Sequence, residues 1–175
     1  MKRVFSTLKE LKWKPNIKFV KEYYKEDLYL NSIADLIKDN WKKKDTGKIL
    51  IFSYHGLPKK YIDRGDTYYH ACLETSDLIA KKLNIKKENF ITSFHSKFGF
   101  GQWTQPYTEN LLLELPKKGI KSISIISPSF TIDCLETLEE IAIQFKDDFI
   151  NAGGEKFNYI PCLNEKKAMF LLLKN

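Results

Sequence analysis

The chain has few cysteines, glycines and prolines: 3, 8 and 6 among its 175 residues. Cys72, Cys134 and Cys162 lie far apart and form no CxxC pair. We therefore expect reduced, structural thiols, and we expect no [2Fe-2S] cluster. No apolar run approaches the roughly 18 to 20 residues needed to span a bilayer. The N-terminal stretch lacks the apolar core and cleavage site of a secretory signal, so we expect a cytoplasmic protein.

Several catalytic motifs are also missing. The sequence contains no GxSxG elbow, no phosphate-binding P-loop and no HExxH zinc motif. The segment "GFGQW" (99–103) is too short for a dinucleotide fingerprint. Cys134 has no local signature of a cysteine nucleophile. These absences remove the commonest hydrolase, nucleotide-binding and metalloprotease classes.

The net charge of +7 invites a nucleic-acid interpretation. The lysines are scattered over segments typical of helix ends and loops, so we expect no nucleic-acid partner. A hydrophobic content of 43% is enough for a packed core, which argues against disorder. Contact with an anionic membrane surface is left open, because no single basic patch points to it.

Short apolar runs alternate with helical patterns along the chain. Strands are predicted at 48–55, 89–95, 121–130 and 156–162, and helices at 28–43, 67–83, 105–118 and 133–151. This order predicts an α/β fold with a four-stranded parallel, Rossmann-like sheet flanked by helices. We expect a single domain over 1–175, with a helical lead-in (1–45), a β-α-β-α-β-α-β core (46–165) and a closing helix (166–175).

Two histidines end predicted strands, and ligands of open α/β sheets bind at that edge. His55 closes the first strand and His95 the second, so their positions alone do not separate them. Gly56 and Pro58 follow His55 and form a turn that permits close approach and stiffens the exit. His70 falls inside a predicted helix, where a surface or packing role is expected.

The helix predicted at 133–151 carries a polar ridge opposite its apolar stripe. Its members are Asp133, Glu136, Glu140, Gln144 and Asp147. One interpretation is a solvated face whose first acids complement the helix dipole. The other is a row of oxygen ligands or proton acceptors leading toward a strand-end histidine. Histidine nitrogen with carboxylate oxygen suits a divalent metal such as Fe²⁺.

Four segments, taken in order, resemble the ferrochelatase family. They are "LIFSYHGLPKKYIDRGDTYY", "SFHSKFGFGQWTQPYTENLL", "SPSFTIDCLETLEEI" and "AGGEKFNYIPCLN". The resemblance covers nearly the whole chain, but it extends only to the second half of the family's sequence. It implies a fold of two similar Rossmann-like halves, with a porphyrin in the cleft between them.

The resemblance implies insertion of Fe²⁺ into protoporphyrin IX, the last step of haem synthesis, with the metal as substrate and no tightly bound cofactor. It assigns catalysis and metal handling to His55 and Glu136. It implies substrate-binding positions at Trp103, Ser96, Phe130 and Asp133, and a relay through Glu140 and Gln144. His95 stands where the family does not require histidine.

The partners implied are protoporphyrin IX, ferrous iron and an N-terminal half that supplies the other cleft wall. Without that half, we expect this chain to be poorly active. Contact with the inner face of the membrane is a further implication. Two alternatives are a cobalt or nickel chelatase acting on a related tetrapyrrole, and a non-catalytic porphyrin- or metal-binding remnant.

Overall fold

The computed structural model describes residues 2–17, 20, 22–44 and 47–165. Four parallel strands form one sheet in the order β2-β1-β3-β4. The strands are β1 (Ile49–His55), β2 (Phe90–His95), β3 (Ser122–Ile126) and β4 (Lys156–Tyr159). The predicted α/β class and the four-stranded parallel sheet are confirmed. The predicted closing helix (166–175) lies outside the described residues.

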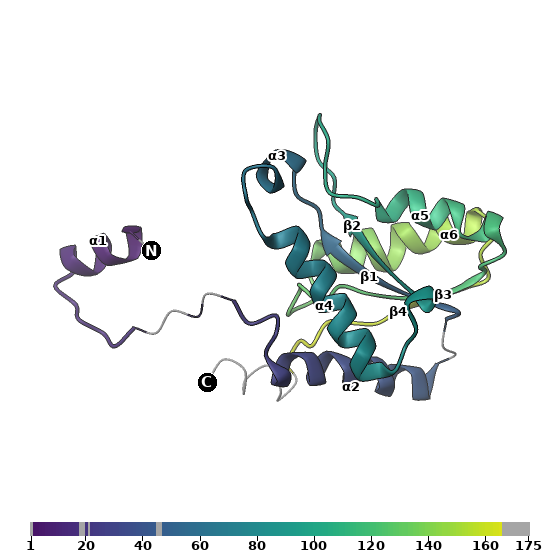
Figure 1. Ribbon diagram of the computed structural model, residues 1–175, viewed down its shortest axis with the longest axis horizontal. Coiled ribbons are helices and arrows are strands. Elements are labelled where there is room, and N and C mark those ends of the chain that lie inside the picture. The colour runs from purple at the N-terminus through teal and green to yellow at the C-terminus, as the bar shows by residue number, and fades with distance from the viewer. Residues whose placement is uncertain (1, 18–19, 21, 45–46, 166–175) are drawn as a thin grey trace.

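Helices cover both faces of the sheet (Figure 1). On one face lie α2 (Asp27–Lys43) and α4 (Tyr68–Leu83), which contact each other. On the other lie α5 (Thr108–Glu114), the helix η3 (Glu136–Phe145) and α6 (Lys146–Asn151). Because both faces are covered, β1 is an almost continuous buried run, as expected for the interior of a parallel sheet.

The alternation of side chains along β1 divides the core in two. Leu50, Phe52 and Tyr54 pack in the cluster with α2 and α4, while Ile49 and Ile51 pack in the cluster with α5, η3 and α6. Successive strand residues point to opposite faces, so Ser53 and His55 share the face of Ile49 and Ile51. The sheet therefore directs its terminal histidine toward the side of η3.

Element ends differ from the prediction where proline interrupts backbone hydrogen bonding. The strand predicted at 121–130 stops at Ile126, ahead of Pro128, and the one predicted at 156–162 stops at Tyr159, ahead of Pro161. The helix predicted at 105–118 is α5 followed by a 3₁₀ turn, Pro116–Lys118. Proline has no backbone N–H and disfavours the helical conformation in the preceding residue.

Helix α1 (Lys2–Glu10) lies within the predicted helical lead-in. Two short elements were not specified by the sequence patterns: α3 (Lys59–Ile62) and the 3₁₀ turn η1 (Lys87–Asn89). Helix α1 lies apart from the sheet in Figure 1. No helix in the described part of the chain is both long and apolar enough to cross a bilayer.

The helix predicted at 133–151 has a different geometry from the one expected. Residues Glu136–Phe145 form a π-helix, and only Lys146–Asn151 continue as an α-helix. In a π-helix each backbone N–H bonds five residues back, which widens the turn, and such segments occur frequently at functional sites. Ile141 and Phe145 are buried against the sheet, while Gln144 is exposed.

We predict that Phe52→Ala lowers the free energy of unfolding by about 3–5 kcal/mol, because it leaves a cavity in the core. Phe52 has 0% exposure at the centre of the sheet. The measurement is urea unfolding followed by circular dichroism. The matched control is Phe98→Ala, since Phe98 is 84% exposed; its effect should stay within about 0.5 kcal/mol. Equal losses in the two variants would contradict the assigned core.

Candidate active site

His55 and His95 lie side by side at the carboxyl edge of the sheet. They are partners in the parallel register of β1 with β2, and their ring centroids are 6.1 Å apart. The Nδ1 atom of His55 is 2.8 Å from the carbonyl oxygen of Gly56. A carbonyl only accepts, so Nδ1 carries a proton, which leaves Nε2 as the ring nitrogen that can offer a lone pair.

The turn after His55 holds the two strand ends together. The backbone N–H of Gly56 donates to the carbonyl of His95 at 2.8 Å. A Cβ at position 56 would lie 3.0 Å from that oxygen and 3.3 Å from the ring of Trp103. Close approach therefore favours glycine here, and the same turn packs against the ring of Trp103.

His95 is the more deeply buried of the two histidines, with 3% exposure. Its Nδ1 is 2.8 Å from the hydroxyl of Ser53. That hydroxyl is 2.7 Å from the hydroxyl of Thr108, which in turn is 2.8 Å from that of Ser93. Burial, reinforced by the neighbouring His55, lowers the pKa of His95 to about 3. The ring is therefore neutral near pH 7.

Phe130 covers both imidazoles. Its ring stacks on His95 with centroids 5.5 Å apart and lies 6.4 Å from the ring of His55. It comes from the segment between β3 and η3, where Phe130 N–H donates to the carbonyl of Ser127. The histidine pair is thus shielded by an aromatic ring on one side.

Glu136 faces the two histidines from the first turn of η3. A hydrogen bond with the Cys134 side chain and another from its own backbone N–H lower the pKa of Glu136, and the positive charge of either imidazole would lower it further. The carboxylate is therefore charged at neutral pH. The structure brings His55, Glu136 and Phe130, all predicted site residues, to one place, and adds His95.

Glu140 is joined to the end of β2 instead of standing free. Its carboxylate accepts from the backbone N–H of Ser96 at 2.8 Å and from the Ser96 hydroxyl at 2.5 Å. Ser96 has a φ of +57°, a left-handed conformation uncommon for residues other than glycine. Glu140 thus holds a strained residue that follows directly on His95. Gln144 lies farther along η3 and is exposed.

Asp133 is surrounded by protein donors. Its Oδ1 accepts from the hydroxyls of Tyr159 and Thr137 and from the backbone N–H of Cys162, and its Oδ2 accepts from the amide of Asn164 at 2.7 Å. Its backbone N–H also donates to Asn164 at 2.8 Å. Asp133 therefore ties the start of η3 to the segment after β4.

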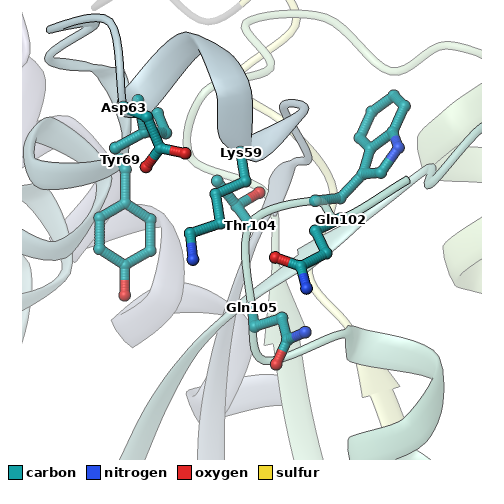
Figure 2. A pocket seen from close by; sticks show the side chains of 8 residues that line it. Lys59, Asp63, Tyr69, Gln102, Thr104 and Gln105 are labelled. Atoms are coloured by element: carbon teal, nitrogen blue, oxygen red, sulfur yellow. The ribbon is translucent and has the colours of Figure 1, made fainter.

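Trp103 borders two hollows on the surface. One is a cavity of about 380 Å³ whose polar side chains include Lys59, Tyr69, Gln102 and Gln105. Figure 2 shows the Lys59 amine and the two glutamine amides pointing toward the same space. The other measures about 530 Å³ and is bordered by the exposed rings of Phe98 and Phe100.

Sequence reasoning left His95 without a role because its claim rested on strand position alone. The signal that could have identified His95 as a site residue is the pairing of equivalent strand ends, because two histidines at the ends of adjacent parallel strands point the same way. Within the described residues, no three His, Cys, Asp or Glu side chains are arranged to hold a metal ion. The site thus offers a histidine pair and a carboxylate, without a closed metal cage.

We predict that Asp133→Asn lowers the free energy of unfolding at pH 7 by about 1.5–3 kcal/mol, the range for hydrogen bonds to a charged group. Burial acts to raise the pKa of Asp133, but the hydrogen bonds from Asn164 and Tyr159 outweigh it and hold the pKa below its ordinary value. The stabilisation is therefore present above the ordinary pKa and is lost as pH falls through the lowered one.

Urea unfolding of both proteins at several pH values checks this, and the two curves should converge in acid. Asp147→Asn is the control, because Asp147 is exposed on α6. A pH-independent difference for Asp133→Asn would contradict the assigned hydrogen bonds.

Comparison with known proteins shows the family of the chain. The family model described as Ferrochelatase matches residues 1–175. The chain is 39% identical over 166 residues to a ferrochelatase of Vibrio cholerae serotype O1, covering 95% of this chain and 52% of that protein. It is 43% identical over 151 residues to one of Vibrio vulnificus (86% and 47%), and 41% identical over 165 residues to one of a Janthinobacterium species (94% and 45%). The chain thus spans about half the length of these relatives, and it belongs to the ferrochelatase family.

Proposed function

We propose that this chain provides one wall of a site that inserts Fe²⁺ into protoporphyrin IX to form haem. The observation that carries the proposal is the free Nε2 of His55 beside the charged carboxylate of Glu136. Family membership and the names of the relatives support the same reaction. The relatives are about twice as long, so we propose that a second polypeptide segment supplies the opposite wall.

The chemistry needs a proton acceptor and a place for a dication. Metallation removes two protons from the pyrrole nitrogens while Fe²⁺ exchanges water for ring nitrogens. An imidazole with a free Nε2 lone pair can accept such a proton. The carboxylate of Glu136 attracts the dication and offers an oxygen ligand, and nitrogen with oxygen suits Fe²⁺.

The macrocycle requires flat apolar contacts and a few polar ones. Phe130 offers an aromatic ring next to His55, and Trp103 offers one beside Gly56. Such rings pack well against a planar π-system. Ser96 and Asp133 are already bonded to protein groups, so we assign them to shaping the site around the substrate. Glu140 and Gln144 continue from Glu136 along η3 as the proposed path for protons or metal.

The remaining features of the proposal concern location and cofactors. We propose that the protein acts in the cytoplasm, with peripheral membrane contact where the porphyrin is delivered. We propose no tightly bound cofactor, with iron entering as substrate.

The test is a metal-insertion assay on the chain alone and together with the complementary half of the Vibrio cholerae relative. Loss of porphyrin fluorescence and growth of haem absorbance report the reaction. We expect low activity from the chain alone, because half of the cleft is absent, and a marked rise with the partner. Full activity from the isolated chain would contradict the need for a second wall.

In the reconstituted pair, we predict that His55→Ala lowers kcat by about 10²–10⁴-fold, the usual contribution of a positioned acid or base. His70→Ala is the control, because His70 is exposed on α4; its rate should equal that of the wild type. Wild-type rates in His55→Ala would contradict the assignment of His55 as a catalytic residue. Porphyrin binding without metal insertion in any pairing would point instead to a binding remnant.

A further inference from the structure

His95 carries a buried ring nitrogen that nothing in the fold uses. Its Nε2 has no hydrogen-bond partner among the described residues, although the ring is almost fully buried. Leaving a buried polar group unsatisfied costs about 1–3 kcal/mol. Such a group calls for an explanation, and a bound ion or a catalytic role is among the recognised ones.

The hydroxyl chain behind His95 decides which atom faces the site. Either Nδ1–H donates to Ser53, whose hydroxyl donates on to Thr108, or both bonds run the other way. The first arrangement leaves a lone pair on Nε2, and the second leaves a buried N–H. Orphaned buried N–H groups are the rarer of the two. The first arrangement is also the usual one for metal-binding histidines, whose second nitrogen donates to a neighbouring oxygen.

The spacing of the two histidines fits a shared ion. Nitrogen ligands lie about 2.0–2.1 Å from a first-row divalent metal, so two imidazoles on one ion have ring centres roughly 5–6.5 Å apart. The observed separation of the rings of His55 and His95 is 6.1 Å, and their planes are inclined at 66°. Both rings keep Nε2 free, and both have Nδ1 held by an oxygen atom.

We propose that Nε2 of His55 and Nε2 of His95 together bind a divalent first-row metal ion, with the carboxylate of Glu136 as its counter-charge. The inference rests on the proposed function in one respect, since the ion would be the metal substrate on its way to the porphyrin. Phe130 covers both rings, so the ion enters past that side chain. Two nitrogen ligands are fewer than a permanent metal site has, so they suit an ion that binds transiently and is then released.

The first test needs no substitution. The full chain, labelled with ¹⁵N at histidine, is titrated with Zn²⁺ in the absence of porphyrin, and the ring nitrogens are followed by NMR. We expect the Nε2 resonances of His55 and His95 to shift together, with those of His70 unchanged. A shift at His55 alone, or at neither histidine, would overturn the proposal.

The second test compares affinities for Co²⁺ measured by visible absorption. His95→Gln should bind Co²⁺ at least about tenfold more weakly than the wild type, as should His55→Gln, since the loss of even an indirect ligand partner costs 10–100-fold. His70→Gln should bind like the wild type. Glutamine keeps an amide that can reach Ser53, and thermal unfolding checks that each variant folds. Unchanged affinity in a folded His95→Gln would overturn the proposal.

The two tests are independent of metal insertion, so the outcomes remain distinct. A chain that binds Zn²⁺ through both histidines but never metallates porphyrin with any partner half supports the metal site and refutes the proposed function. If the reconstituted enzyme metallates porphyrin but the Nε2 resonance of His95 does not shift with Zn²⁺, only the role of His95 is refuted.

Discussion

The parallel register between β1 and β2 is the constraint on which the site depends. It pairs residue with residue from Leu50 opposite Phe90 to His55 opposite His95. Because neighbouring strands in a sheet lie about 4.8 Å apart, this pairing alone brings the two imidazoles to one edge, on one face. The turn at Gly56, the Phe130 ring and the π-helix are all arranged around that edge. Each adds a wall or a charge to a pair that the sheet has already placed.

The π-helix η3 forms the second wall of the site, and side-chain hydrogen bonds fix its start and its middle. Asp133 binds the start of the helix to the segment after β4, and Glu140 binds its middle to the residue after His95. Glu136 lies between these two attachments. Its carboxylate is thus carried by a backbone that cannot shift without breaking hydrogen bonds to charged groups, which are stronger than neutral ones. A rigid frame of this kind suits the proposed role of Glu136, which is to face a dication at a set distance.

The sheet and its main helices could be predicted from sequence because their signals are local. Runs such as "KILIFSYH" and the apolar spacing of Leu30, Ile33 and Ile37 need only a short window to be read. The π-helix could not, since apolar residues three to five apart suit an α-helix equally well. The bond between Glu140 and Ser96 joins residues 44 positions apart, and no spacing rule reaches that far. The same holds for the partners of Asp133 near Asn164. For His95, the sequence predicted only its position at the end of a strand, and the register of β1 with β2 shows that His55 is its neighbour.

The division of the core by alternate residues of β1 has an evolutionary consequence. Substitutions along this strand change volume and cost stability, but they leave each side chain on its own face. A single inserted or deleted residue between Gly47 and Ile49 would instead move every following side chain of the strand to the opposite face, because the side-chain period of a strand is 2. Leu50, Phe52 and Tyr54 would then point toward η3, and His55 would point toward α4, away from His95 and Glu136. Lineages that keep this site can therefore vary the composition of β1 but not its length.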